Sequence, residues 1–108
     1  MAMKPVVVAL SRSGEVTARK VAAVLGASVH GREGRVNRAD AFFANALDHV
    51  RDLFAAGVPV VGVCASGILI RAVAPLLMDK LTEPPVVSVS DDGAVVVPLL
   101  GGHRGANR

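Results

Sequence analysis

Residues 6–10 read Val-Val-Val-Ala-Leu, and this stretch decides the fold class of the chain. A continuous apolar run is typical of a strand that is buried on both faces of a sheet. The polar segment 11–14 follows it and opens a helical pattern, for which we predict Ser13 as the N-cap and Gly26 as the C-terminal stop. The side chains that we expect to face inward from this helix are Val16, Val21, Val24 and Leu25. Because residues 27–30 can form a short second strand, the opening predicts a strand–helix–strand unit.

A second helix is predicted to begin at Asp40 and to end at Gly57, after the basic loop 31–38. Four apolar side chains of this segment recur with the 3.6-residue period of a helix: Phe43, Leu47, Val50 and Phe54. Residues 58–63 then predict a third strand, with Pro59 tolerated near its start.

The last part of the chain predicts one more helix and a hairpin. Residues 68–80 are apolar and helical in pattern, and Pro75 is expected to kink or restart the helix. Residues 86–90 and 94–97 flank Asp-Asp-Gly, which is a strong signal for a hairpin turn. Strands that alternate with helices before a final hairpin predict a three-layer α/β domain of the Rossmann or flavodoxin-like class, with a mainly parallel sheet.

The size and composition of the chain indicate one domain, residues 1–108. No apolar run reaches the roughly 18–20 residues that a membrane helix needs, and the start lacks the features of a secretory signal. We therefore expect a cytoplasmic protein without a membrane partner. The net charge of +3 permits an acidic partner without requiring one. Because the chain has no Tyr or Trp on which to stack bases, nucleic acid is not an expected partner.

Ligands of open α/β sheets bind beyond the carboxyl ends of the strands, and three polar segments are predicted to follow such ends: residues 11–14, 64–67 and 101–107. In the second segment a buried strand leads through small residues into a helix, so the N–H groups of Ser66 and Gly67 could bind an anion. The alternative is that Ser66 only caps the helix and Gly67 only relieves packing. The third segment concentrates glycine with His, Arg and Asn, which suggests a piece of a longer protein.

Three residues in or beside the last predicted helix each have two interpretations. Arg71 lies among apolar residues, where it either pairs with a carboxylate such as Asp79 or reaches into a site. Lys80 is either a solvated residue that the helix dipole stabilises or an anion contact. Cys64 follows a buried strand, and we interpret it as an inert thiol rather than a nucleophile.

The histidines carry no metal signal in the sequence. His30 and His49 are isolated along the chain and suit a solvent or packing role. Three scattered histidines lack the spacing of zinc ligands, so no metal site is predicted. A single cysteine excludes an intramolecular disulfide framework.

Residues 61–80 read VGVCASGILIRAVAPLLMDK, and residues 98–107 read PLLGGHRGAN. Together with Glu-Pro-Pro-Val at residues 83–86, they resemble the N-terminal domain of the CbiG family of cobalamin biosynthesis. The resemblance implies a relation to cobalt-precorrin-5A hydrolases, which open a lactone ring and release acetaldehyde. Related domains also precede a precorrin-3B C17-methyltransferase, and Glu83-Pro84 and Gly105-Ala106-Asn107 resemble that fused form.

The resemblance implies a substrate-handling domain excised from a larger precorrin-processing enzyme and inactive by itself. Its expected partners are a polyanionic corrin precursor and the downstream domains of the same chain. It implies no cofactor in this domain, and S-adenosylmethionine only in a fused methyltransferase domain. The expected substrate-binding residues, which would meet carboxylates of the precursor, are Ser66, Gly67, Arg71, Lys80, Arg104 and Asn107. His103 is the candidate catalytic base.

Two other functions are compatible with the sequence. The chain could be a non-catalytic docking module that contacts only the rest of its own polypeptide. Less expected is a small phosphate- or nucleotide-binding domain, which would rest on the turn 64–67 alone.

Overall fold

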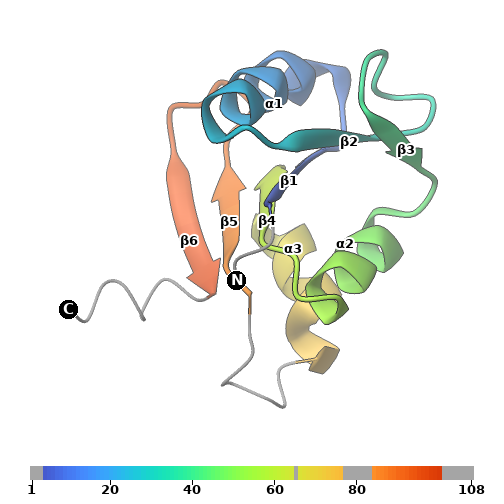
Figure 1. Ribbon diagram of the computed structural model, residues 1–108, viewed down its shortest axis with the longest axis vertical. Coiled ribbons are helices and arrows are strands. Elements are labelled where there is room, and N and C mark those ends of the chain that lie inside the picture. The colour runs from blue at the N-terminus through green and yellow to red at the C-terminus, as the bar shows by residue number, and fades with distance from the viewer. Residues whose placement is uncertain (1–3, 65, 77–83, 101–108) are drawn as a thin grey trace.

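The computed structural model describes residues 4–64, 66–76 and 84–100, with only the backbone at residues 66, 76 and 100. Within these residues, six strands form one sheet with the order β3-β2-β1-β4-β5-β6 (Figure 1). The strands are β1 (Val6–Ala9), β2 (Ser28–Arg32), β3 (Ala41–Phe43), β4 (Val60–Val63), β5 (Val86–Val89) and β6 (Val96–Leu100). The helices are α1 (Arg12–Leu25), α2 (Ala46–Ala55) and α3 (Ser66–Val73), and a short 3₁₀ helix, Ala74–Leu76, follows α3.

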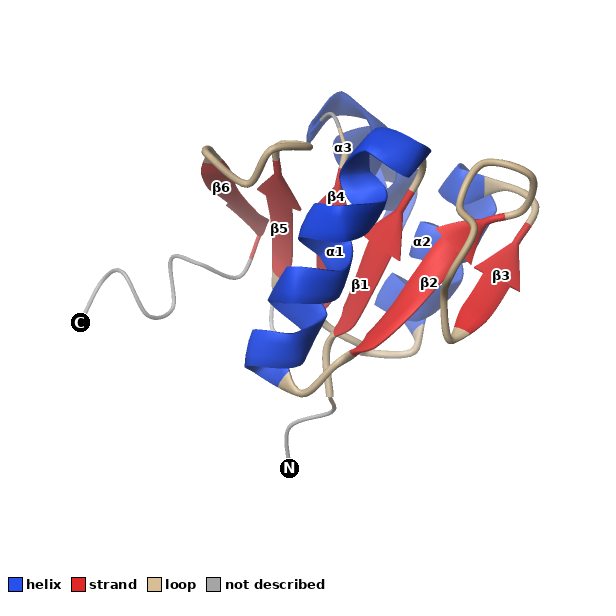
Figure 2. Cartoon of the chain, turned by 90° about the horizontal axis from the view of Figure 1, so that it is seen from above, coloured by secondary structure: helices blue, strands red, loops and turns tan. Residues whose placement is uncertain are grey.

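The sheet is parallel except at one edge. Strands β1 to β5 run in the same direction, and β6 pairs antiparallel with β5. Helix α1 covers one face of the sheet, and α2 and α3 cover the other (Figure 2). The predicted three-layer α/β class is therefore confirmed, as are the mainly parallel sheet and the C-terminal hairpin.

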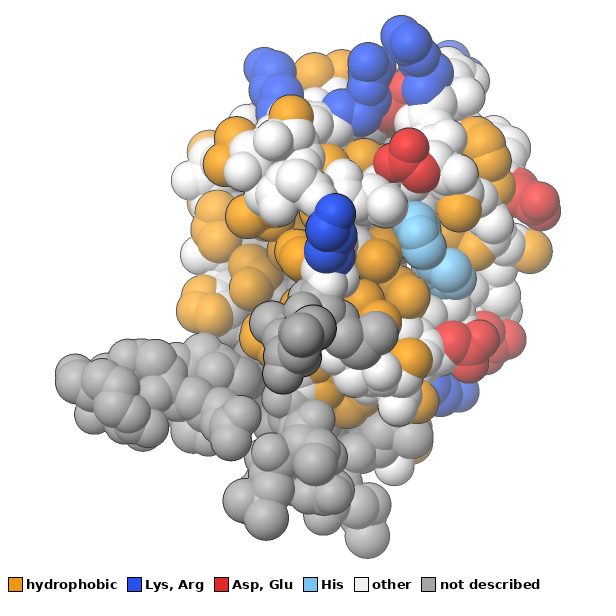
Figure 3. Space-filling model, in the orientation of Figure 1, with side chains coloured by type: hydrophobic (Ala, Val, Ile, Leu, Met, Phe, Trp, Pro, Cys, Tyr) orange, Lys and Arg blue, Asp and Glu red, His pale blue; other side chains and the backbone are white. Residues whose placement is uncertain are grey.

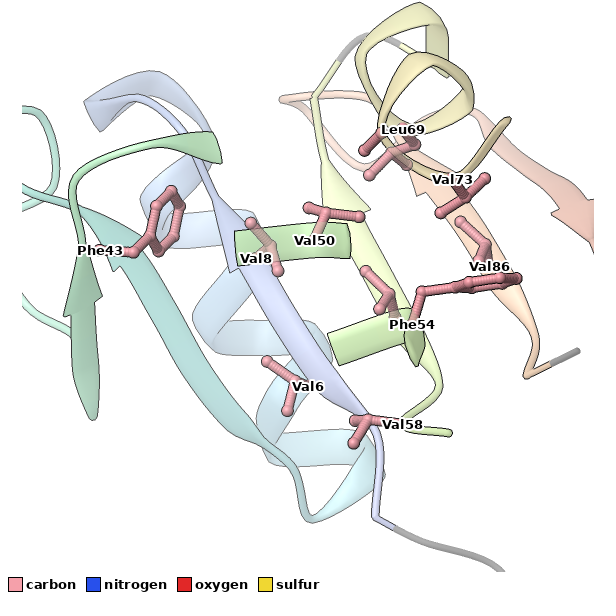
Figure 4. Close-up of a cluster of buried hydrophobic side chains, with 11 residues drawn as sticks. Val6, Val8, Phe43, Val50, Phe54, Val58, Leu69, Val73 and Val86 are labelled. Atoms are coloured by element: carbon pink, nitrogen blue, oxygen red, sulfur yellow. The ribbon is translucent and has the colours of Figure 1, made fainter. Parts of the chain in front are cut away.

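The core lies on both faces of the sheet because side chains alternate along each strand. In β1, Val6 and Val8 point toward α2 and α3, whereas Val7 and Ala9 point toward α1. The larger side chains gather on the α2–α3 face, where Phe43, Val50, Phe54 and Leu69 fill the space between helices and sheet (Figure 4). This burial on two faces explains why β1 reads as an uninterrupted apolar run.

Helix α1 differs from the sequence prediction in its start and in its inward face. The N-cap is Ser11, not Ser13, while Gly26 ends the helix in the left-handed conformation as predicted. Val16, Val24 and Leu25 do not face the core; the exposed fraction of Val24 is 85%. The buried residues are instead Gly14, Glu15, Ala18 and Ala22. These residues are mostly small, so α1 approaches the sheet closely: a Cβ added at Gly14 would lie 2.9 Å from Val63 Cγ1.

The segment predicted as the start of the second helix is a strand. Residues 41–43 form β3, and Phe43 enters the core from this strand rather than from a helix. Helix α2 begins only at Ala46, because the Asn45 side chain accepts a 3.0 Å hydrogen bond from the Asp48 N–H and caps the helix there. The helix ends at Ala55, just before Gly57, whose φ of 83° lies in the left-handed region.

The loop predicted at 31–38 is shorter than expected, because Gly31 and Arg32 belong to β2. The remaining loop is anchored by the buried side chain of Val36, which packs directly on Gly31. A Cβ at Gly31 would lie 2.8 Å from Val36 Cβ, so a larger residue would push the loop away from the sheet.

The predicted break at Pro75 is confirmed, because α3 ends at Val73 and the 3₁₀ helix takes over. Residues 77–80 lie outside the described part of the chain. None of the described helices is long and apolar enough to span a membrane.

Candidate functional site

The carboxyl ends of the five parallel strands meet at one edge of the sheet, which we call the carboxyl edge. From β1 the chain passes through α1 to β2 on one side, and from β4 it passes through α3 to β5 on the other. The strand order therefore reverses between β1 and β4, which is where open α/β sheets bind their ligands. The predicted segments 11–14 and 64–67 both begin at this edge.

The third predicted segment does not begin there. Strand β6 is antiparallel, and its last residue Leu100 pairs with Val86, the first residue of β5. The chain therefore leaves β6 at the opposite edge, and the expectation of three loops at one edge is wrong for residues 101–107. His103, Arg104 and Asn107 lie outside the described residues, as does Lys80, so their expected roles stay predictions.

A pocket of about 220 Å³ opens at the carboxyl edge on the α2–α3 face. We call it the arginine pocket, and its lining residues are Leu10, Arg32, Ala44, Asn45, Ala46, Leu47, Ile68 and Arg71. Arg71 comes from α3 and Arg32 from the last position of β2, so two arginine residues from distant parts of the sequence line one hollow. The N-terminus of α2 forms a third positive element of the wall.

The walls of the arginine pocket are held together by contacts between α2 and α3. Arg51 Nε donates a 3.0 Å hydrogen bond to the Ala72 carbonyl oxygen, joining the two helices. Leu10 and Ile68 supply the apolar part of the lining. The pocket therefore combines fixed helices, an apolar floor and two cationic side chains, a combination suited to a carboxylate on an apolar body.

Sequence reasoning found Arg71 and missed Arg32. The signal for Arg71 was a cation among apolar residues of a helix, and the structure places it, exposed, at the pocket. Arg32 was assigned to the basic loop because residues 31–38 contain two further arginines, Arg35 and Arg38. Only its place at the carboxyl end of β2 distinguishes Arg32 from the arginines of the loop that follows. The suggested pairing of Arg71 with Asp79 falls on a residue outside the described part.

Gly67 and Ser66 lie at the start of α3 on the carboxyl edge, as predicted. A Cβ added at Gly67 would meet nothing within 4 Å among the described residues, which argues against the interpretation that this glycine relieves packing. Ser66 is the first residue of α3, and the backbone N–H groups in the first turn of a helix have no partner within that helix.

A second hollow at the same edge has the opposite electrostatic character. It measures about 590 Å³ and is lined by Cys64, Ser88, Ser90, Asp91, Asp92, Val95 and Val97. Burial, and after it the negative charge of Asp91, raise the pKa of the Cys64 thiol to about 11. The thiol therefore stays protonated at neutral pH, which agrees with the interpretation of Cys64 as inert. Two aspartates make this hollow unfavourable for an anionic ligand.

The first turn of α1 is occupied by a carboxylate of the chain itself. Ser13 Oγ donates a 2.6 Å hydrogen bond to Asp91 Oδ2, and Ser11 Oγ lies 2.8 Å from Ser13 Oγ. Thr17 donates to the backbone oxygen of Asp91. In dinucleotide-binding folds a phosphate sits at this helix N-terminus. Here Asp91 holds that position, which disfavours a phosphate at this turn.

His30 and His49 are not isolated in the fold. His30 Nδ1 and His49 Nε2 lie 2.7 Å apart, and the Phe43 ring stacks on His49 with a centroid distance of 4.5 Å. Burial lowers the pKa of both histidines, and Asp40 and Asp52 partly offset this at His30 and His49 respectively. Among the described residues, no group of three or more His, Cys, Asp or Glu side chains could hold a metal ion.

These features define a doubly wound α/β domain with a small pocket, lined by two arginines, at the carboxyl edge of its sheet. Residues 48–108 match the sequence model of the family described as Cobalamin synthesis G N-terminal. Because the match covers more than half of the chain, the chain belongs to this family, CbiG_N, which confirms the resemblance seen in the sequence.

Curated relatives agree with this assignment over part of their length. The cobalt-precorrin-5A hydrolase of Salmonella typhimurium is 38% identical over 66 residues, which is 61% of this chain and 18% of the relative. The cobalt-precorrin-5A hydrolase of Priestia megaterium is 46% identical over 39 residues, which is 36% of this chain and 10% of the relative. The matched segment thus spans less than a fifth of either relative. No solved structure matches the chain.

Proposed function

We propose that this chain is a substrate-handling domain of a larger precorrin-processing enzyme and that the arginine pocket binds a carboxylate arm of the corrin precursor. The observation that carries the proposal is the convergence of Arg32 and Arg71 on one pocket at the reversal of strand order. Corrin precursors carry acetate and propionate groups around an apolar macrocycle, and guanidinium groups bind carboxylates through paired hydrogen bonds.

The size of the pocket limits what it can hold. Sites for whole drug-sized ligands measure roughly 300–1,000 Å³. A pocket of about 220 Å³ accommodates one or two carboxylate arms and leaves the macrocycle outside. The remaining surface for the macrocycle would come from other domains of the enzyme, so the domain by itself supplies a subsite and not a complete active site.

For the parent enzyme we propose a cobalt-precorrin-5A hydrolase, because both curated relatives carry that name. A fusion with precorrin-3B C17-methyltransferase is the second possibility. It rests on Glu83-Pro84 and Gly105-Ala106-Asn107, and S-adenosylmethionine would then bind in the fused domain. In either enzyme His103 is the proposed catalytic base, and Arg104 is a proposed contact for a carboxylate of the precursor.

Binding can be tested by titrating the chain with a corrin that carries free carboxylates and following its absorbance. Saturable binding that weakens with added salt is expected. Arg32→Gln and Arg71→Gln should each weaken binding by roughly five- to tenfold, because each removes a charge-assisted contact that is partly open to solvent. Arg19→Gln is the matched control, since Arg19 is exposed on α1 across the sheet. Equal affinities of all three variants and the unmodified chain would refute the assignment.

A docking role for the same domain is favoured by its exposed apolar side chains. Val16, Val24 and Leu25 on α1 and Val95, Val96 and Val97 on the hairpin are all more than 40% exposed. The proposed occupant is the rest of the parent polypeptide, since the match covers only 18% of the Salmonella relative. In the full-length enzyme, Val24→Ser with Val96→Ser should then loosen this domain, measured as faster proteolysis between domains. An unchanged digestion pattern would argue against docking on this face.

A further inference from the structure

The histidine pair joins two elements that the sequence keeps apart. His30 lies on β2, hydrogen-bonded as a strand between β1 and β3, and His49 lies on α2. Their facing ring nitrogens are 2.7 Å apart, with ring centroids 4.9 Å apart and planes tilted by 43°. Two imidazole nitrogens therefore point at one position between the rings.

Both rings are held in place before any ligand arrives. His49 stacks on Phe43 with an interplanar angle of 8°, and Phe43 is itself a buried core residue. His30 has strand neighbours on both sides, paired with Val8 and Ala41. Binding at this position would therefore cost little ordering of the ligating side chains.

The protonation states of His30 and His49 also suit a bound group that accepts lone pairs from the two rings. A hydrogen bond between two neutral imidazoles uses one N–H and one lone pair. If the proton of the donating imidazole moves to the other nitrogen of the same ring, both facing nitrogens present lone pairs. No proton then has to leave the protein. Burial keeps the pKa of both histidines below the usual value, so protons compete little at neutral pH.

The charges around the pair favour a cation. Asp40 acts electrostatically on His30 and Asp52 on His49. Asp40 Oδ2 accepts a 2.8 Å hydrogen bond from the Val29 N–H, which holds this negative charge beside β2. Arg32, on the same strand as His30, lines the arginine pocket instead. His30 and His49 are both half-buried, and Figure 3 shows histidine side chains at the surface with acidic side chains nearby.

We propose that His30 and His49 form a two-histidine site for a divalent transition metal ion such as Zn²⁺, Ni²⁺ or Cu²⁺, with water completing the coordination. Neutral imidazole suits these ions, whereas Mg²⁺ and Ca²⁺ prefer oxygen ligands. Metal–nitrogen bonds of about 2.0–2.1 Å in tetrahedral geometry place the nitrogens about 3.4 Å apart. The rings need to separate by only about 0.7 Å from their present 2.7 Å.

Calorimetric titration of the full chain with NiCl₂ or ZnCl₂ at neutral pH tests the site. One saturable equivalent is expected, and the same metal should raise the Tm because it binds only the folded pair. His30→Gln and His49→Gln should each lower the affinity by at least about tenfold, the loss seen even for residues that only support metal ligands. His103→Gln is the matched control and should leave the affinity unchanged.

Three results would overturn the proposal. The first is no saturable binding, which would leave a hydrogen-bonded pair only, and the second is equal binding in His30→Gln and His49→Gln. The third is that His103→Gln loses metal binding while His30→Gln and His49→Gln keep it, which would identify His103 as the ligand instead. Imidazole ¹⁵N spectra give an independent readout that does not depend on variants folding, since His30 Nδ1 and His49 Nε2 should both shift on metal addition. None of these outcomes depends on corrin binding.

Discussion

Ser13 Oγ donates a 2.6 Å hydrogen bond to Asp91 Oδ2, so the first turn of α1 is joined to the turn between β5 and β6, 78 residues away. The N-cap residue Ser11 makes no side-chain capping bond of its own. Asp91 instead brings a negative charge to the positive end of the helix dipole. A carboxylate from another part of the fold is thus held at the N-terminus of α1 by the Ser13 side chain.

Replacing Asp91 should therefore destabilise the domain. Asp91→Ala removes the acceptor for Ser13 and the charge near α1, and we expect a loss of about 1 kcal/mol in the free energy of unfolding, as for a helix cap. Urea denaturation measures this loss. Asp92→Asn is the matched control in the same turn, because its remaining Oδ1 still accepts from Ser90 and Ala94. Equal stability of Asp91→Ala and the unmodified chain would show that the contact contributes nothing.

Stability should fall when the histidine pair is acidified. Burial lowers the pKa of His30 and His49 below 6.5 in the folded protein, so the unfolded chain binds protons first as the pH falls. The free energy of unfolding should then decrease as the pH falls below 6.5, until both folded pKa values have been passed. His49→Gln should show a shallower decrease as the pH falls through and below 6.5.

This pH window is separate from the one in which Asp92 takes up a proton. Hydrogen bonds from Ser90 and the Ala94 N–H lower the pKa of Asp92 below 3.8. Its contribution is present above that pH and is lost only at stronger acid. A decrease in stability above pH 5 that is identical in His49→Gln would contradict the assignment to the pair.

Two glycine substitutions should have opposite effects. Gly31→Ala places a Cβ 2.8 Å from Val36 Cβ and 3.1 Å from Ala39 Cβ, atoms close to the backbone that cannot rotate away. We expect a loss of about 1–3 kcal/mol, as for other overpacked sites. Gly67→Ala places a Cβ that has no neighbour within 4 Å in the described part of the chain, and it lies in α3, so it should be neutral or stabilising by up to about 1 kcal/mol. Thermal unfolding followed by circular dichroism distinguishes them, and a neutral Gly31→Ala would refute the anchored loop.

The role of Asn45 as the N-cap of α2 can be tested by comparing alanine substitutions at two asparagines. Asn45→Ala removes the acceptor for the Asp48 N–H and should cost about 1 kcal/mol. Asn37→Ala is the control, because Asn37 is exposed and bonds Glu15 through its backbone N–H. Since Asn45 also lines the arginine pocket, its loss should weaken corrin binding as well. Equal unfolding midpoints of the two variants would contradict the capping role.

Much of the fold could be predicted from residue patterns because it depends on local periodicity. The apolar run at Val6–Ala9, the stop at Gly26 and the hairpin around Gly93 each follow from short-range sterics and burial. The predicted secondary structure was wrong where one pattern of apolar residues fitted both a helix and a strand followed by a helix. Residues 40–54 fit a helical period, yet Asn45 starts the helix and leaves Phe43 on a strand.

The sequence by itself determined the α/β class, the family and one arginine of the pocket, since apolar runs, turn residues and linked motifs are all local signals. Only the tertiary structure decided which distant side chains meet. Strand pairing and the packing of α2 and α3 on the sheet brought Arg32 and Arg71 to one pocket and His30 against His49, and the antiparallel β6 ends at the far edge. Strand order and direction are fixed by packing of the whole sheet between its helices, and no spacing along the chain specifies them.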